Sequence, residues 1–137
     1  MSDLRDLNEI ELARYLVALH EWRWMPGMRE VFSGWRWDGY SFVEQGVRNP
    51  QAGNCISGVL EPLPDLTDDA TRNGCLLALV REATGRPYAH LEYVGGYWSV
   101  VDPEDGRWDP DRGRGPWATE AHALVAALEA APRRGGL

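Results

Sequence analysis

Arginine and tryptophan occur side by side at three places in this sequence. Two are the tripeptides Trp22-Arg23-Trp24 and Trp35-Arg36-Trp37, the third is Arg107-Trp108, and together they hold five of the seven tryptophans. An indole ring stacks on nucleobases, and a guanidinium binds a phosphate group through two parallel hydrogen bonds. These residue types at this spacing indicate a site for a small anionic ligand such as a nucleotide.

The segment 109–115 adds two more arginines on a glycine-rich stretch that is able to close over a ligand. The predicted ligand-binding residues are Arg23, Trp24, Trp35, Arg36, Trp37, Arg107, Trp108, Arg112 and Arg114. The competing interpretation is structural and is the more frequent case: tryptophans build small cores, and arginines cover them as cation–π neighbours. A ligand site requires the arginines to converge on one cavity, whereas a structural role does not.

Other residue types give no recognisable catalytic or metal-binding pattern. His20, His90 and His122 lie on different predicted elements, and no two histidines have the spacing of a zinc site. The carboxylates around residues 65–69 fit the start of a helix, and those of 102–111 fit a solvated turn rather than a calcium loop. We therefore expect no catalytic residue, no metal and no cofactor, and we predict a non-catalytic function.

The charge balance restricts the partners. The chain has 14 basic and 21 acidic residues, a net charge of −7. A surface of this kind does not bind the nucleic-acid backbone, which requires a basic footprint. It remains compatible with an acidic face that docks on a basic protein. The oligomeric state is left open, and a homo-oligomer is compatible with the sequence.

Hydrophobic periodicity predicts three helices. The first covers 4–22, with Asn8 or Ser2 as its cap, and ends before Pro26-Gly27. The second begins at an N-cap on Thr67 and ends at Gly85, where glycine suits a left-handed C-terminal residue. The third runs from a cap on Thr119 to Ala131.

Strand signals predict one hairpin and a less regular region. Residues 89–94 and 97–102 flank Gly95-Gly96, which supplies the positive φ angles of a two-residue turn. That register places Tyr93 opposite Trp98 and Leu91 opposite Val100, and we expect these four side chains to form the core face. Two or three short strands are expected within 27–64, including a piece at 55–60, with a loop at 49–54. A further loop is expected at 102–117.

The order of elements predicts an α+β domain, an antiparallel sheet with helices packed on it. The length suits a single domain over 1–132, followed by a frayed tail at 133–137. The sequence shows no secretory signal and no apolar run long enough for a membrane span, so we expect a cytoplasmic protein. Cys55 and Cys75 form no disulfide framework and fit a reducing compartment, with Cys75 expected to be buried.

About half of the chain resembles a group of small, uncharacterised proteins encoded by bacteriophages and prophages, and more loosely the phage domains described as α-β-α sandwiches. The segments that carry the resemblance are 22–28, 63–71, 74–83 and 119–132. The resemblance implies a phage accessory protein expressed in the bacterial cytosol, and such proteins often counter host immunity. It carries over no catalytic residue.

Two functions follow from these expectations. The first is non-catalytic binding of a small anionic ligand, such as a nucleotide immune signal, which would be removed from the host. The second is inhibition of a host defence or nucleic-acid-processing protein, by docking on a basic surface of that protein with exposed aromatic side chains as anchors.

Overall fold

A computed structural model of the chain describes residues 4–44, 47–48, 61–110 and 115–131. The predicted loop at 49–54, the strand piece at 55–60, Arg112, Arg114 and the tail at 133–137 lie outside the described residues. In chain order the elements are a 3₁₀ turn Leu4–Asp6, α1 Glu9–Val17, β1 Arg36–Trp37, β2 Phe42–Glu44, β3 Val47–Arg48, a π-helical segment Ala70–Leu76, α2 Leu77–Thr84, β4 His90–Val94, β5 Tyr97–Val101 and α3 Glu120–Ala130.

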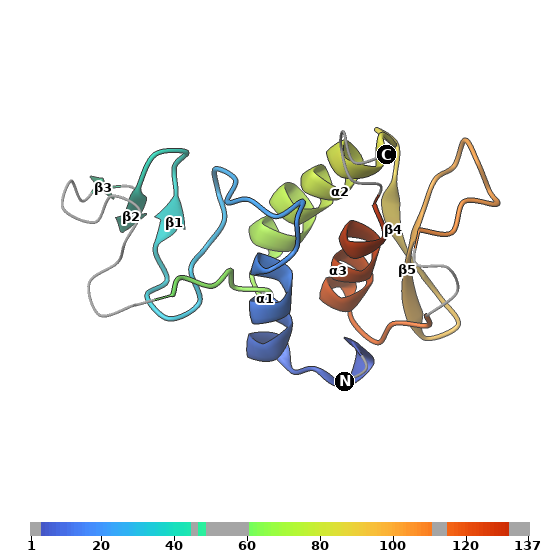
Figure 1. Cartoon of the computed structure of the whole chain (residues 1–137), viewed down its shortest axis with the longest axis horizontal. Helices are drawn as coiled ribbons and strands as arrows, with labels where there is room; N and C mark the ends of the chain where they lie inside the picture. Colours follow the sequence, from blue (N-terminus) through green and yellow to red (C-terminus); the bar gives the residue numbers. More distant parts are fainter. Residues whose placement is uncertain (1–3, 45–46, 49–60, 111–114, 132–137) are drawn as a thin grey trace.

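The helices lie between two small antiparallel sheets (Figure 1). The sheet β1–β2–β3 is at one end of the molecule, and the β4–β5 hairpin is at the other. The α+β class is therefore confirmed, with the strands divided between two sheets. None of the helices in the described part of the chain is long and apolar enough to cross a membrane.

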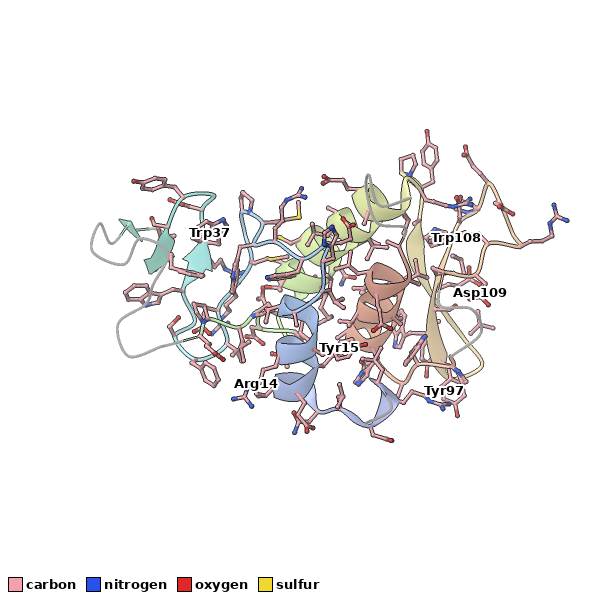
Figure 2. The ribbon with its side chains drawn as sticks, in the orientation of Figure 1. Arg14, Tyr15, Trp37, Tyr97, Trp108 and Asp109 are labelled. Carbon is pink, nitrogen blue, oxygen red and sulfur yellow. The ribbon has the colours of Figure 1, made fainter. Side chains whose placement is uncertain are left out.

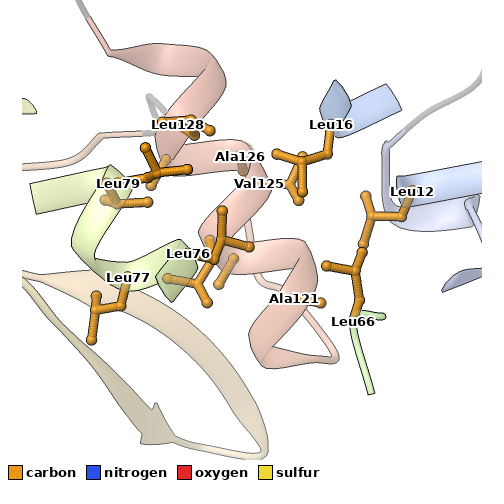
Figure 3. Packing of buried hydrophobic residues seen from close by; sticks show 14 of the residues in the cluster. Leu12, Leu16, Leu66, Leu76, Leu77, Leu79, Ala121, Val125, Ala126 and Leu128 are labelled. Carbon is orange, nitrogen blue, oxygen red and sulfur yellow. The ribbon is translucent and has the colours of Figure 1, made fainter. Parts of the chain in front are cut away.

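Helix α3 is the centre of the core. Every residue from 121 to 128 is buried, and the helix packs against α1, α2 and β5 (Figure 3). Its alanines allow close approach on several sides, while Leu124, Val125 and Leu128 supply the larger apolar volume. The predicted cap is confirmed, because the Thr119 hydroxyl accepts a hydrogen bond from the backbone N–H of His122 at 3.1 Å.

Helix α1 is shorter than predicted. It begins after Asn8, whose side chain accepts a bond from the Glu11 N–H while the Glu11 carboxylate accepts one from the Asn8 N–H. This capping box fixes the start and separates the helix from the 3₁₀ turn before it. After Val17 the backbone continues in tighter turns, with Leu19 N–H donating to Leu16 and Trp22 N–H to Leu19. The expectation of one helix over 4–22 is wrong.

The second helical region starts differently from the prediction and ends as expected. Thr67 is not its cap, because its hydroxyl and N–H both donate to Asp65. The Asp68 carboxylate instead accepts the N–H of Thr71, and the first turns are π-helical. Gly85 ends α2 with φ +70°, in the left-handed region. Cys75 is buried as expected, and burial raises the pKa of its thiol.

The hairpin has the predicted register but a different core face. Gly95 and Gly96 have φ +66° and +89°, and Tyr93 pairs with Trp98 as expected. Val100 is buried, and Leu91 and Trp98 are half-buried against the core. Tyr93 is instead 57% exposed. The reason is that α3 packs against β5, so the far end of β4 extends beyond the cover that the helix provides.

Candidate functional site

Arg36 is fixed by a carboxylate of the same chain. Its guanidinium donates to both oxygens of Asp68, at 2.8 and 2.9 Å, and to the carbonyl of Gly27 at 2.9 Å. Asp68 also accepts bonds from the N–H and hydroxyl of Thr71. Hydrogen bonding from Arg36, opposed by partial burial and aided by the bonds from Thr71, holds the pKa of Asp68 well below its usual range. Arg36 thus ties β1 to the helical region.

Arg23 is also paired. It donates to both carboxylate oxygens of Glu82, one of them at 3.1 Å, with both side chains partly exposed. A cleft of about 260 Å³ borders this pair and is lined by His20, Glu21, Trp22, Arg23, Leu79, Glu82 and Ala83. An anion entering the cleft would compete with Glu82 for the guanidinium, and the second carboxylate, of Glu21, would repel it.

The tryptophans near β1 and β2 pack on one another. Trp24 and Trp37 both meet Phe42 in edge-to-face contacts, with ring centroids 4.9 and 5.1 Å apart, and Trp22 meets Trp24 at 5.6 Å. Phe42 is 1% exposed, so these rings enclose it. Trp35 is half-buried at the start of the same region. This is the structural role that the sequence left as the competing interpretation.

Trp108 lies at the opposite end of the molecule from Trp37 (Figure 2), and Arg107 directly precedes it in the chain. Trp108 stacks with the guanidinium of Arg86 at 4.9 Å, and Arg86 also bonds Asp102 at 3.0 Å. Arg107 itself is exposed. Sequence adjacency pointed to Arg107 as the partner of Trp108, but the partner is Arg86, twenty-two residues earlier, and no local signal identifies it.

The described arginines therefore do not converge on one cavity. Arg23 and Arg36 each hold a carboxylate from the helical region, and Arg107 lies by the hairpin. Arg112 and Arg114 are outside the described residues. The geometry that a small-anion site requires is thus not present among the predicted residues that the structure describes.

A larger cavity of about 370 Å³ lies where α1 and the start of α3 meet, away from the predicted residues. Several of its polar side chains have partners. Arg72 donates to the Leu66 carbonyl at 3.1 Å and lies 3.7 Å from Glu120. His122 bridges Thr119 and the carbonyl of Leu7. These contacts are consistent with a structural joint between helices, and within the described ranges no three His, Cys, Asp or Glu side chains are grouped to hold a metal.

A buried carboxylate that the sequence did not reveal organises the segment before β1. Glu30 is fully buried, and its oxygens accept bonds from the N–H groups of Phe32, Ser33 and Leu63, at 3.0, 2.8 and 3.0 Å. Three backbone donors compensate for the loss of water around the charge. Glu30 therefore clamps the turn at 30–34 to the chain at 63.

The hairpin presents a different kind of surface. Four large side chains there are at least half exposed or nearly so: Tyr88 at 58%, Tyr93 at 57%, Val94 at 63% and Tyr97 at 49%. We call these four residues the hairpin surface. Tyr88 precedes β4, Tyr93 lies on the face of Leu91 and Trp98, and Val94 and Tyr97 lie on the opposite face. A cleft of about 260 Å³ adjoins the hairpin surface between β5 and the segment 115–117. Tyr93 was predicted to lie in the core, and no sequence signal singled out the other three, although Val94 and Tyr97 alternate with the core positions.

Exposed carboxylates lie on the hairpin and in the loop that follows it. Glu92 is 51% exposed in β4, and Glu104 and Asp109 are exposed in the loop that follows β5. Asp102 is different because it is buried. The N–H of Glu104 and then the guanidinium of Arg86 hold its pKa below the usual value. The hairpin end thus combines exposed aromatic rings with negative charge.

Comparisons with protein-family models, with curated proteins and with solved structures find no match to this chain.

Proposed function

We propose that the protein acts without catalysis, by binding a basic face of another protein through the hairpin surface. The observation that carries the proposal is the exposure of Tyr93, Val94 and Tyr97 around the turn of one hairpin, with Tyr88 exposed just before β4 and exposed carboxylates on the hairpin and in the loop after it. Tyrosine is enriched among the residues that dominate binding energy at protein interfaces, and complementary charge sets the encounter rate and the choice of partner.

Electrostatics favours a basic partner. The net charge of −7 gives the whole chain a field that attracts positive surfaces, and Glu92, Glu104 and Asp109 bring part of that charge next to the exposed rings. At the hairpin end Arg86 is paired with Asp102 and Asp105, and the exposed Arg107 offsets only part of the negative charge.

The resemblance to phage and prophage proteins extends the proposal to the biological setting. In that setting the partner is a bacterial host protein of defence or nucleic-acid processing, and the bound state blocks its activity. Binding of a small anionic ligand stays a prediction, and no contact among the described residues favours it over protein binding.

One experiment separates these functions. The full chain, immobilised, is incubated with bacterial lysate at low and at high salt, and the same preparation is tested in a thermal-shift assay with cyclic and linear nucleotides. Protein binding predicts a stoichiometric basic partner whose recovery falls as salt rises, and no shift with any nucleotide. A nucleotide that raises the melting temperature, with no stoichiometric protein recovered, would overturn the proposal.

Two double variants, each with two carboxylates neutralised, test where on the protein the charge acts, and the pair away from the hairpin is the control. Glu92→Gln combined with Glu104→Gln removes two exposed charges from the hairpin end, whereas Glu9→Gln combined with Glu61→Gln removes two exposed charges elsewhere. The first pair should lower the association rate about tenfold at low salt, and the second about threefold or less. Equal losses would show that only net charge matters and that the hairpin is not the docking face.

A further inference from the structure

The two edges of the hairpin differ in how their backbone groups are used. In a two-residue hairpin, the residues that flank the turn form a hydrogen-bonded pair, here Val94 and Tyr97, and bonded pairs then alternate with non-bonded ones. Tyr93 and Trp98 form a non-bonded pair, so their N–H and C=O groups point away from the partner strand. The N–H of Trp98 indeed points outward and donates to the Trp117 carbonyl at 2.8 Å.

The corresponding edge of β4 is only partly covered. At Ala89 the N–H donates to the Arg86 carbonyl at 3.1 Å, and the carbonyl accepts from Arg81 Nε at 2.7 Å. Every second residue after Ala89 has its backbone groups on the same edge, so the N–H and C=O groups of Leu91 and Tyr93 also lie on the outer edge of β4. Among the residues that the structure describes, these two make no hydrogen bond there. Two donors and two acceptors are therefore presented in the spacing of a strand.

The side chains beside this edge specify what can bind to it. An added strand places its side chains alternately on the two faces of the sheet, next to those of β4. On one face the neighbours are His90, Glu92 and Val94; the Glu92 carboxylate is 51% exposed and lies 4.0 Å from Nε2 of His90. On the other face they are Leu91 and Tyr93, which are apolar and aromatic. Basic residues fit beside Glu92, and apolar residues fit beside Leu91 and Tyr93.

We infer that the outer edge of β4 binds an extended segment of the partner protein as an added strand, and that basic and apolar residues alternate in this segment. The inference rests on the proposed function and specifies which part of the partner is bound, namely an extended segment. Backbone hydrogen bonds to Leu91 and Tyr93 provide the pairing, and the exposed Glu92 provides selection for positive charge.

A second copy of this chain fits the edge less well. Two chains of net charge −7 repel each other, and an antiparallel pairing centred on Glu92 sets this carboxylate opposite its copy. Charge complementarity thus favours a basic segment over self-association.

The probe is a synthetic peptide of about eight alternating lysine and valine residues, blocked at both ends. It is titrated into the ¹⁵N-labelled full chain at low salt, with backbone amide exchange as the readout. Edge binding should slow exchange of the Leu91 and Tyr93 amides about tenfold or more, while the inward Glu92 amide changes little. A lysine–proline peptide of equal length, which lacks N–H groups at its prolines, should give no such protection.

Two substitutions at position 93 isolate the contribution of its backbone N–H group to peptide binding. Tyr93→Pro removes an outward N–H without removing a hairpin bond, and Tyr93→Thr removes the same ring but keeps the N–H. The proline variant should bind the lysine–valine peptide about fivefold more weakly than the threonine variant. Circular dichroism and the protection of the Glu92 amide in both variants check that the hairpin stays folded.

Equal binding by the two variants, or shifts at the carboxylates with no protection of Leu91 and Tyr93, would overturn the added strand. If the lysate partner is still recovered in that case, the proposed function stands and only the edge fails. If neither partner nor peptide binds, both fail. Protection of the two amides without peptide, together with a concentration-dependent dimer in sedimentation, would assign the edge to a second copy and overturn the basic segment.

Discussion

Both ends of the molecule pair arginine with carboxylates and pack tryptophan, but more of the exposed large apolar side chains lie at the hairpin end. At the end that carries β1–β3, Arg36 is held by Asp68, Trp24 and Trp37 enclose Phe42, and Phe32 and Tyr40 are exposed. At the hairpin end, aromatic side chains such as Tyr97 stay exposed beside carboxylates. The contrast teaches that an arginine–tryptophan motif is a poor guide to function until the partner of each arginine is known. Stability should depend on the first end and binding on the second.

The largest stability effect is expected at Glu30. Glu30→Ala leaves one buried and two part-buried backbone N–H groups without an acceptor, and a buried unsatisfied group costs about 1–3 kcal/mol. We expect a loss of about 3 kcal/mol or more in the free energy of unfolding, measured by urea titration with tryptophan fluorescence. Glu61→Ala, at an exposed carboxylate, is the control and should change stability by less than about 0.5 kcal/mol. Similar stability of the two variants would show that the hydrogen bonds of Glu30 do not stabilise the fold.

The Arg36–Asp68 pair should give the next largest effect. Asp68→Asn removes the charge that receives two bonds from Arg36, and we expect a loss of about 2 kcal/mol at neutral pH. Urea titrations at pH 7 measure it.

The same pair predicts a pH dependence. The pKa of Asp68 is lower in the folded state than in the unfolded chain, so the stability it contributes is present above the unfolded pKa and is lost as pH falls below about 4. The wild type should therefore lose more stability between pH 5 and pH 2 than Asp68→Asn does. Parallel stability curves would contradict this assignment.

A smaller effect at the hairpin tests its turn. Gly96 has φ +89° and open space around its Cα, so Gly96→Ala should cost about 1 kcal/mol through backbone strain alone. Gly74 lies in a helical segment, also with open space, and Gly74→Ala should stabilise by about 0.5–1 kcal/mol. Thermal unfolding of the two variants gives the comparison, and a shift of the same sign in both would show that the turn is not under this constraint.

Local signals predicted the parts of the fold that are decided locally. Gly95-Gly96 gave the correct register because a two-residue turn fixes it. Thr119 marked a helix start through its side-chain hydroxyl, and Gly85 marked a helix end through its left-handed backbone. The start of the second helical region was missed because Asp65 engages Thr67. Such competition between neighbouring polar side chains is not visible in hydrophobic periodicity.

The candidate site was less predictable, since it depends on contacts between distant residues. Arg36 meets Asp68 across 32 positions, and Arg23 meets Glu82 across 59. Nothing in the local sequence distinguishes an arginine that pairs with a distant carboxylate of the same chain from one that binds a ligand. The exposure of Tyr93 likewise depends on where α3 packs along the hairpin, which the alternation of a strand does not specify.

The central claim is that binding resides at the hairpin end and not at the other. The direct test compares capture of the lysate partner by two double variants of the full chain, each matched to wild type for melting temperature. Val94→Ser with Tyr97→Ser removes exposed side chains from the hairpin surface, and Tyr15→Ser with Phe32→Ser removes exposed side chains elsewhere. The first should reduce capture about tenfold or more and the second less than about twofold. Loss of capture by the second variant, with the first unaffected, would contradict the account.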